Sequence, residues 1–296
     1  MIRVVVLGTT AALPTKRSHS SCIAVRYGGD YLFDCCEGCQ RQMMKHGISP
    51  MRVNAVFVTH LHADHFLGLF GLVQTMGLQG RTQPLLIVGP KGTKELFSTV
   101  FSLKPLRPAF PIAYKEISRA GAVYRNELFS VKAFPVKHTA KAYGYVLDAH
   151  SYRRFDEAKA KSLGVRGRMF TELQEKGAVT VDGKKIKYAD VTYLQSGKKL
   201  VYTGDTAPCP AIARNAAGAD LLVHESSFHS DQKELAAEKL HATAAQAAKA
   251  AASAKVKKLM LIHFSNRYED KRPLLEEAKK VFDQTILAEE GLEVII

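Results

Sequence analysis

Three histidines and one aspartate fall within six positions of the chain, in the run Thr59-His60-Leu61-His62-Ala63-Asp64-His65. The run directly follows the apolar segment Ala55-Val-Phe-Val. In extended backbone, His60 and His62 project to the same side and can hold one ion, whereas Asp64 and His65 turn into a helix start and can serve a second ion. Neutral imidazole and carboxylate suit zinc. Unpaired ionisable groups are costly to bury, so the run predicts a metal site rather than a structural cluster.

Other His, Asp and Glu residues follow apolar segments elsewhere in the chain. They are Asp34, His138, Asp205, the pair His224-Glu225, and His263. Strand ends on one edge of a layered α/β fold converge on a common rim. We therefore expect these side chains to meet the first cluster.

The number of ligands indicates two ions per chain. His60, His62 and His138 would hold one ion, and Asp64, His65 and His263 the other, with Asp205 between them. Two ions about 4 Å apart can clamp the attacking and leaving oxygens of a phosphoryl displacement. The predicted reaction class is metal-assisted hydrolysis. Zinc is the expected metal, and manganese and iron share this ligand chemistry.

Short β-branched runs alternate with helical stretches, which predicts an α/β fold. Expected strands are Arg3–Leu7, Cys22–Tyr27, Tyr31–Asp34, Ala55–Thr59, Leu85–Val88, Phe129–Val136, Leu200–Thr203, Leu221–Val223 and Leu259–Ile262. Expected helices are Glu37–His46, Phe66–Met76, Lys94–Leu103, Ala242–Ala254 and Pro273–Asp283. Several strands are apolar on both faces and should be covered by helices.

Composition narrows the class of protein. The 296 residues are 46% hydrophobic and 24% charged, which is typical of soluble globular proteins and excludes disordered, collagen-like and disulfide-rich chains. No apolar run is long enough to span a bilayer, and the first residues predict no targeting segment. Five cysteines, an odd number, indicate a reducing compartment such as the cytoplasm. Cys36-Glu-Gly-Cys39 lacks a second pair to complete a four-thiolate site, and free thiols are the preferred interpretation.

The net charge of +14 predicts attraction to a polyanion, most simply nucleic acid. Residues 151–200 carry twelve Lys and Arg against six Asp and Glu. This segment is either a mobile basic element that binds phosphates or a solvated loop.

The metal-ligand pattern resembles the metallo-β-lactamase superfamily, and other segments resemble the ribonuclease Z family of tRNA 3′-processing endonucleases. The segments that carry this second resemblance are 7–21, Phe33-Asp-Cys-Cys-Glu-Gly-Cys-Gln-Arg-Gln42, Tyr143-Gly-Tyr145, Tyr202-Thr-Gly-Asp-Thr206, His224-Glu-Ser-Ser-Phe228, His241-Ala-Thr243 and His263-Phe-Ser-Asn-Arg-Tyr268.

The resemblance implies a four-layer αβ/βα sandwich, a single domain over residues 1–296, two zinc ions and a homodimer. It matches the seven ligands above. It further implies that Asp64 orients the attacking water or takes its proton, and that Glu225 and His241 assist proton transfer to the leaving 3′ oxygen. Asp34 would support the metal-binding loops without binding the metal itself.

The resemblance also implies contacts with RNA. Lys16 and Arg17 match a loop near the acceptor end of tRNA, and residues 151–190 match an inserted flexible arm that grips the tRNA elbow. Candidate contacts in the arm are Arg153, Arg154, Arg166 and Arg168. The chain departs from the family at an arm tip without proline, at Ala63 in place of the commoner glycine, and at Cys36 and Cys39.

We therefore expect a zinc-dependent endoribonuclease that removes 3′ trailers from precursor tRNA. A superfamily hydrolase of small phosphodiesters or sulfate esters is the alternative enzyme, but it leaves the charge and the basic segment unexplained. An RNA-binding scaffold with an inactive site is the third reading, and the complete set of ligands disfavours it.

Overall fold

The computed structural model describes residues 1–296, and the chain folds into two compact units. Unit 1 comprises Met1–Asp148 and Lys199–Ile296, and unit 2 comprises Ala149–Lys198. None of the helices combines the length and the apolar character needed to cross a bilayer.

Unit 1 contains two seven-stranded sheets. The first has the order β18-β1-β2-β3-β4-β5-β6, with β1 (Arg3–Gly8), β2 (Cys22–Arg26), β3 (Asp30–Phe33), β4 (Val53–Phe57), β5 (Leu85–Pro90), β6 (Ile112–Ile117) and β18 (Glu293–Ile295). The second has the order β17-β16-β15-β14-β9-β8-β7, with β7 (Gly121–Arg125), β8 (Phe129–Pro135), β9 (Tyr143–Ala149), β14 (Lys199–Tyr202), β15 (Leu221–Glu225), β16 (Leu259–Ile262) and β17 (Thr285–Leu287).

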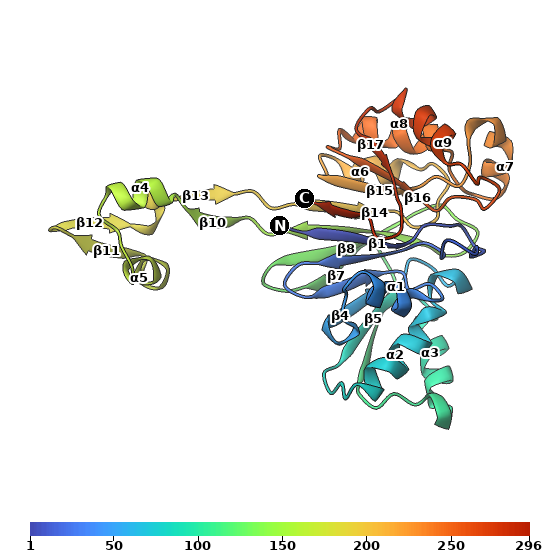
Figure 1. Ribbon diagram of the computed structural model, residues 1–296, viewed down its shortest axis with the longest axis horizontal. Helices are drawn as coiled ribbons and strands as arrows, with labels where there is room; N and C mark the ends of the chain where they lie inside the picture. The colour runs from blue at the N-terminus through green and yellow to red at the C-terminus, as the bar shows by residue number, and fades with distance from the viewer. The chain divides into compact units, whose positions relative to one another are not determined.

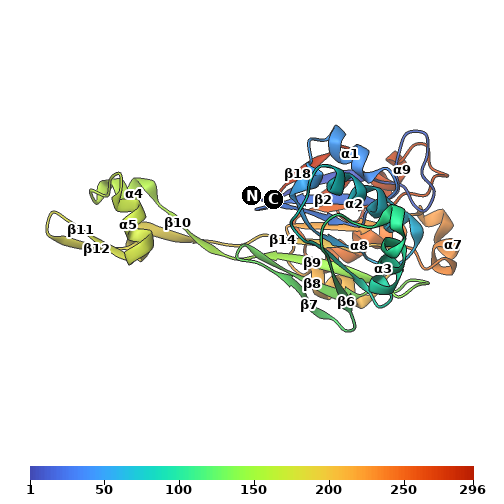
Figure 2. The same ribbon diagram turned by 90° about the horizontal axis from the view of Figure 1, so that it is seen from below.

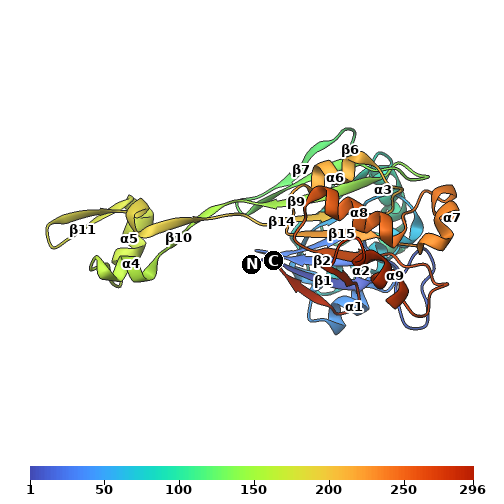
Figure 3. The same ribbon diagram turned by 90° about the horizontal axis from the view of Figure 1, so that it is seen from above.

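Helices cover the outer face of each sheet (Figure 1). The first sheet is covered by α1 (Cys39–Lys45), α2 (Gly68–Leu78) and α3 (Thr93–Ser102), which Figure 2 shows from below. The second sheet is covered by α6 (Pro210–Ala216), α8 (Ala244–Ala254) and α9 (Arg272–Lys279), which Figure 3 shows from above, and α7 (Lys233–Glu238) lies near one end. The expected four-layer αβ/βα sandwich is confirmed.

Aromatic rings fill the space between the two sheets. Phe33 of β3 packs on Phe57 of β4, with ring centroids 4.9 Å apart, and meets Tyr145 of β9 at 5.8 Å and Tyr202 of β14 at 5.9 Å. All four residues are buried. Edge-to-face contacts fix the relative position of the rings. This packing therefore fixes the position of one sheet relative to the other.

Four cysteines belong to the apolar core between the first sheet and its helices: Cys22, Cys35, Cys36 and Cys39. They are buried free thiols, and Cys209 is a half-buried one. Burial raises the pKa of the Cys22 thiol well above its ordinary value, which keeps it neutral. These residues act as small core side chains.

Parallel pairing brings the carboxyl ends of several strands to one rim. In the first sheet β3, β4, β5 and β6 are parallel neighbours, and in the second sheet β14, β15, β16 and β17 are. The segments that follow β3, β4, β14 and β16 carry acidic or imidazole side chains. The fold therefore gathers residues that are far apart in the sequence.

Unit 2 has its own elements and its own core. They are the ribbon β10 (Tyr152–Phe155) and β13 (Thr192–Gln195), the hairpin β11 (Ala178–Val181) and β12 (Lys184–Lys187), and the helices α4 (Glu157–Ser162) and α5 (Met169–Lys176). Its buried residues are Ala160, Val165, Leu173, Val179, Ile186 and Val191. The unit is inserted between β9 and β14, which pair antiparallel in unit 1.

Gly68 begins α2 against the loop that follows β3, and its backbone N–H donates to the Cys35 carbonyl at 3.0 Å. A Cβ at position 68 would lie 1.8 Å from the carbonyl oxygen of Cys36, whereas a Cβ at Gly71, three residues further along, would meet only ordinary contacts with Gln40. Gly68 is therefore required for close packing, and Gly71 is not.

We expect Gly68→Ala to lower the free energy of unfolding by about 1–3 kcal/mol because the loop and the helix must separate. Gly71→Ala, at an exposed helical position, should raise it by up to about 1 kcal/mol because alanine is the better helix former. Thermal unfolding followed by circular dichroism measures both. Equal stability of the two variants would contradict this packing argument.

Candidate active site

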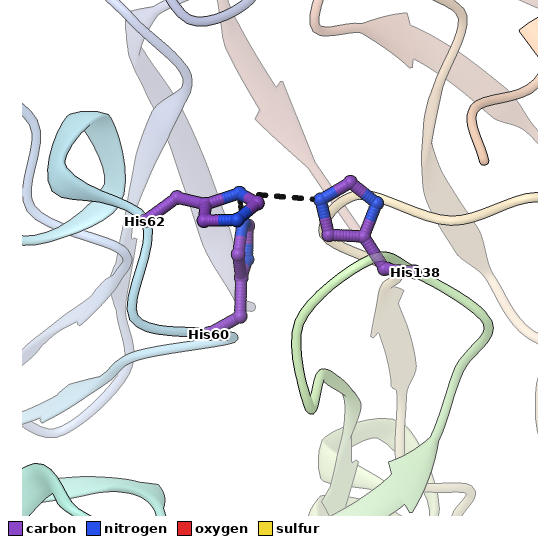
Figure 4. Close-up of side chains that lie close together, drawn as sticks. All are labelled: His60, His62 and His138. Carbon is purple, nitrogen blue, oxygen red and sulfur yellow. Dashed lines mark hydrogen bonds between the residues drawn. The ribbon is translucent and has the colours of Figure 1, made fainter. Parts of the chain in front are cut away.

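Three imidazoles meet where β4 and β8 end. His60 and His62 follow β4 and His138 follows β8, and one nitrogen from each ring lies within 4.8 Å of the others. His60 Nε2 is 3.0 Å from His62 Nδ1, which is 3.3 Å from His138 Nε2 (Figure 4). The backbone of His62 is extended, and a 3₁₀ turn over Ala63–His65 follows it. Beyond this turn the His65 ring lies beside that of His60, with ring centroids 4.1 Å apart.

Asp64, His65 and His263 form a second group, whose ligand atoms also lie within 4.8 Å of one another. Asp64 Oδ2 is 3.2 Å from His65 Nε2. His263 follows β16 and has a φ of +62°, in the left-handed region that side chains other than glycine rarely adopt. Such strain is tolerated where the surrounding structure requires one orientation.

Asp205, which follows β14, lies between the two groups. Its Oδ2 is 3.1 Å from His263 Nε2, 3.4 Å from His65 Nε2 and 3.8 Å from His60 Nε2. Burial alone would raise the pKa of this carboxyl, but His263 and His65 hold it well below its ordinary range. The carboxylate is therefore ionised at the centre of the cluster.

The chemistry of the cluster fits metal binding. Buried polar atoms without a hydrogen-bond partner include His65 Nε2, Asp205 Oδ1 and His263 Nε2, and such atoms are rare in folded proteins. Imidazole nitrogens and carboxylate oxygens are the ligands that zinc prefers. Cations on these atoms would supply the missing partners and offset the cost of burying them.

Asp34 supports this cluster from behind. It follows β3 with a φ of +60° and is completely buried. Its carboxylate accepts from Thr59 N at 2.8 Å, from His65 Nδ1 at 2.8 Å and from the Tyr202 hydroxyl at 3.0 Å. A carboxylate on one imidazole nitrogen fixes the tautomer and leaves the other nitrogen available to a metal.

Buried Glu225 and half-buried His241 form a pair beside the cluster. His241 Nδ1 donates to Glu225 Oε1 at 2.7 Å. Burial opposes protonation of the imidazole, but the Glu225 carboxylate outweighs this and raises the pKa of His241 to about 9. His241 is therefore a cation at neutral pH and can act as a general acid. His224 is buried in β15, and its Nδ1 donates to the backbone carbonyl of Glu225.

A pocket of about 360 Å³ opens onto these side chains. Its lining includes His62, Asp64, His138, Asp205, His241 and His263. A second pocket, of about 450 Å³, contains Lys16 and Arg17 together with Lys271. Ser265 and Asn266 line both pockets, so the two adjoin. Lys16 and Arg17 are thus in the neighbouring pocket rather than in the cluster itself.

The four candidate arginines of the arm belong to unit 2. Arg153 and Arg154 lie on β10, and Arg166 and Arg168 lie between α4 and α5. All four side chains are exposed. This surface can attract phosphates.

Comparison with known proteins decides the family. A family model described as the anti-Pycsar protein Apyc1 matches residues 2–154, and one described as a beta-lactamase superfamily domain matches residues 170–264. A ribonuclease Z of Ignicoccus hospitalis is 43% identical and covers 99% of this chain and 98% of its own length. A ribonuclease Z of Methanosarcina acetivorans is 39% identical, covering 100% and 98%. The chain belongs to the ribonuclease Z family.

Solved structures agree with this membership. The human tRNase Z short form superposes on this chain with a TM-score of 0.73 and 26% identity, covering 99% of both chains. The metallo-beta-lactamase fold protein YhfI of Bacillus subtilis gives a TM-score of 0.72 at 19% identity and 99% and 98% coverage, which supports the fold alone.

Sequence reasoning gave no role to several residues that contact the site. Thr59 and Tyr202 hold Asp34, and the backbone carbonyl of Leu240 lies 3.3 Å from His138 Nδ1. Lys239 and Phe228 line the catalytic pocket. Thr59 precedes His60, and Lys239 and Leu240 precede His241, whereas Tyr202 and Phe228 lie in segments that resemble the family; these were the available signals.

Adding zinc to chelator-treated protein should raise its thermal midpoint because the folded state alone assembles the ligand cluster. At a free zinc concentration about 100 times the dissociation constant, linkage predicts about 2.7 kcal/mol of added stability. Asp205→Asn should shrink this gain, and Asp231→Asn, at an exposed position, should leave it unchanged. A full zinc response from Asp205→Asn would show that Asp205 takes no part in binding.

Proposed function

We propose that this chain is a zinc-dependent endoribonuclease that removes 3′ trailers from precursor tRNA and leaves a 3′ hydroxyl on the tRNA. The observation that carries the proposal is Asp205 Oδ2, which lies within 3.9 Å of imidazole nitrogens from both ligand groups. Membership of the ribonuclease Z family supplies the substrate class.

Two zinc ions per chain are the proposed cofactors. The first would be held by His60, His62 and His138, and the second by Asp64, His65 and His263, with Asp205 between them; manganese or iron can bind the same ligands. When bound, zinc supplies a Lewis acid for the scissile phosphate and makes water more acidic. The proximity of the ligand atoms within each group supports this assignment.

Asp64 and the Glu225–His241 pair divide the proton transfers. Burial would raise the pKa of Asp64, but the His65 imidazole, 3.2 Å away, lowers it below its ordinary value. Asp64 is thus ionised and accepts the proton of the attacking water. His241, charged at neutral pH, donates a proton to the leaving 3′ oxygen of the tRNA while Glu225 fixes its orientation.

Basic residues bind the rest of the substrate. Lys16 and Arg17 bind the acceptor end, since their pocket adjoins the catalytic one. Residues 151–190 form the arm that grips the tRNA elbow, through Arg153, Arg154, Arg166 and Arg168. The net charge of +14 supports a polyanionic partner.

The proposal also covers location and assembly. Five free cysteines suit the reducing cytoplasm. The homodimer rests on the family resemblance, and sedimentation of the purified protein measures it. A small-phosphodiester hydrolase remains the alternative outcome of the assays below.

Asp64→Ala should reduce the cleavage rate of a 3′-extended tRNA transcript by about 10²–10⁴-fold, the range for loss of a general base. Affinity for the transcript should stay close to that of wild type, because Asp64 carries no cationic contact to phosphate. Gel analysis and filter binding measure the two quantities, with Asp231→Ala as the control. Chelator should abolish wild-type cleavage and zinc restore it; loss of RNA binding in Asp64→Ala would contradict the assigned role.

Replacing Arg153–Leu194 with Asn-Gly tests the arm. Tyr152 and Gln195 face each other in the β10–β13 ladder, so a two-residue turn can join them. Precursor-tRNA processing should weaken, mainly through a higher KM, while hydrolysis of a small phosphodiester stays unchanged. The point variant Arg153→Gln/Arg154→Gln/Arg166→Gln/Arg168→Gln should change KM in the same direction. A parallel loss of both activities would contradict a role confined to tRNA.

A further inference from the structure

Ser227 has a buried hydroxyl between the acid pair and the metal ligands, and neither the mechanism above nor the sequence motifs assign it a role. It follows β15, and its side chain is 1% exposed. Its Oγ lies 2.8 Å from Glu225 Oε2, 2.9 Å from His263 Nδ1 and 3.4 Å from His241 Nδ1. No other side-chain hydroxyl contacts Glu225, His241 and His263 together.

The direction of each hydrogen bond follows from the number of protons available. A serine hydroxyl has one proton to donate and lone pairs to accept with. Glu225 Oε2 is a carboxylate oxygen and can only accept, so the Ser227 proton points to it. The Oγ lone pair then faces His263 Nδ1, which must donate.

This pattern fixes the tautomer of His263. A proton held on Nδ1 leaves the lone pair of the ring on Nε2, the buried atom without a hydrogen-bond partner that lies 3.1 Å from Asp205 Oδ2. We propose that Ser227 is a positioning residue that holds His263 with Nε2 directed at the second metal and links that ligand to the Glu225–His241 pair. The inference rests on the proposed function.

Backbone contacts limit the movement of both partners. Ser226 N donates to the Ile262 carbonyl at 2.8 Å, and Ser265 N donates to the Ser227 carbonyl at 3.2 Å. The segments after β15 and β16 are therefore joined on both sides of the Ser227–His263 contact. Loss of the hydroxyl would leave the segments in place and free the His263 ring to change tautomer.

Ser226 provides a matched control for this proposal. It is the adjacent serine, it is also buried, and its Oγ donates to the backbone carbonyl of Ile262 at 3.2 Å rather than to the site. Removing either hydroxyl takes one buried oxygen from the same loop. Only removal of the Ser227 hydroxyl should weaken zinc binding.

The experiment titrates zinc-loaded protein with a competing chelator and follows released zinc with an indicator. Ser227→Ala should weaken the affinity of one of the two zinc ions by about 10–100-fold, the usual effect of removing a partner of a ligating histidine. Ser227→Thr should restore most of the affinity, and Ser226→Ala should match wild type. Wild-type affinity in Ser227→Ala, or an equal loss in Ser226→Ala, would overturn the proposal.

A measurement on the unaltered protein covers the case in which Ser227→Ala fails to fold. Long-range ¹H–¹⁵N spectra of histidine-labelled holoenzyme should find the His263 proton on Nδ1, and a proton on Nε2 would overturn the proposal. Cleavage of 3′-extended tRNA by wild type is scored separately. Normal zinc binding without cleavage would refute the proposed function and leave the tautomer result to stand by itself.

Discussion

The buried carboxylate of Asp34 joins the two sheets at the rim where the site forms. It follows β3 of the first sheet, accepts from Thr59 and His65 beyond β4, and reaches the Tyr202 hydroxyl on β14 of the second sheet. Removal of this one acceptor would leave several buried donors without partners, and each such donor costs about 1–3 kcal/mol. The left-handed backbone of Asp34 is therefore held in place by contacts from three residues in two segments, and the orientation of His65 depends on it.

The two buried carboxylates Asp205 and Glu225 differ in how many of their oxygens accept hydrogen bonds. Asp205 has an oxygen without a hydrogen bond, so a cation can occupy that position. Both oxygens of Glu225 are occupied by donors, from Thr206 N and His241 on one side and from Ser227 and Ala242 N on the other. Burial would raise the pKa of Glu225, but His241 keeps it below its ordinary value. Glu225 therefore has no oxygen left for a cation, whereas Asp205 has one.

Apolar runs predicted the central strands and the strand ends that carry ligands, and each expected strand and helix is present within a few residues of its expected ends. Two strands escaped prediction for different reasons. β6 has exposed polar positions at Lys115 and Glu116, which break its apolar pattern. β9 is almost wholly buried but contains Gly144, a residue unfavourable in strands, whose missing Cβ leaves room for the Phe134 ring. The location of the site was predicted from the clustering of histidine and aspartate residues in the sequence. Thr59, Tyr202 and Ser227 could not be assigned, because their roles depend on contacts with residues up to 168 positions away.

Unit 2 buries only its own residues, from Ala160 to Val191, in a small core that includes none of the residues packed around the catalytic rim. Substitutions, insertions or a new tip within that core leave the aromatic packing between the two sheets untouched. The sequence of unit 2 can therefore diverge without disturbing the residues that surround the His and Asp cluster of unit 1.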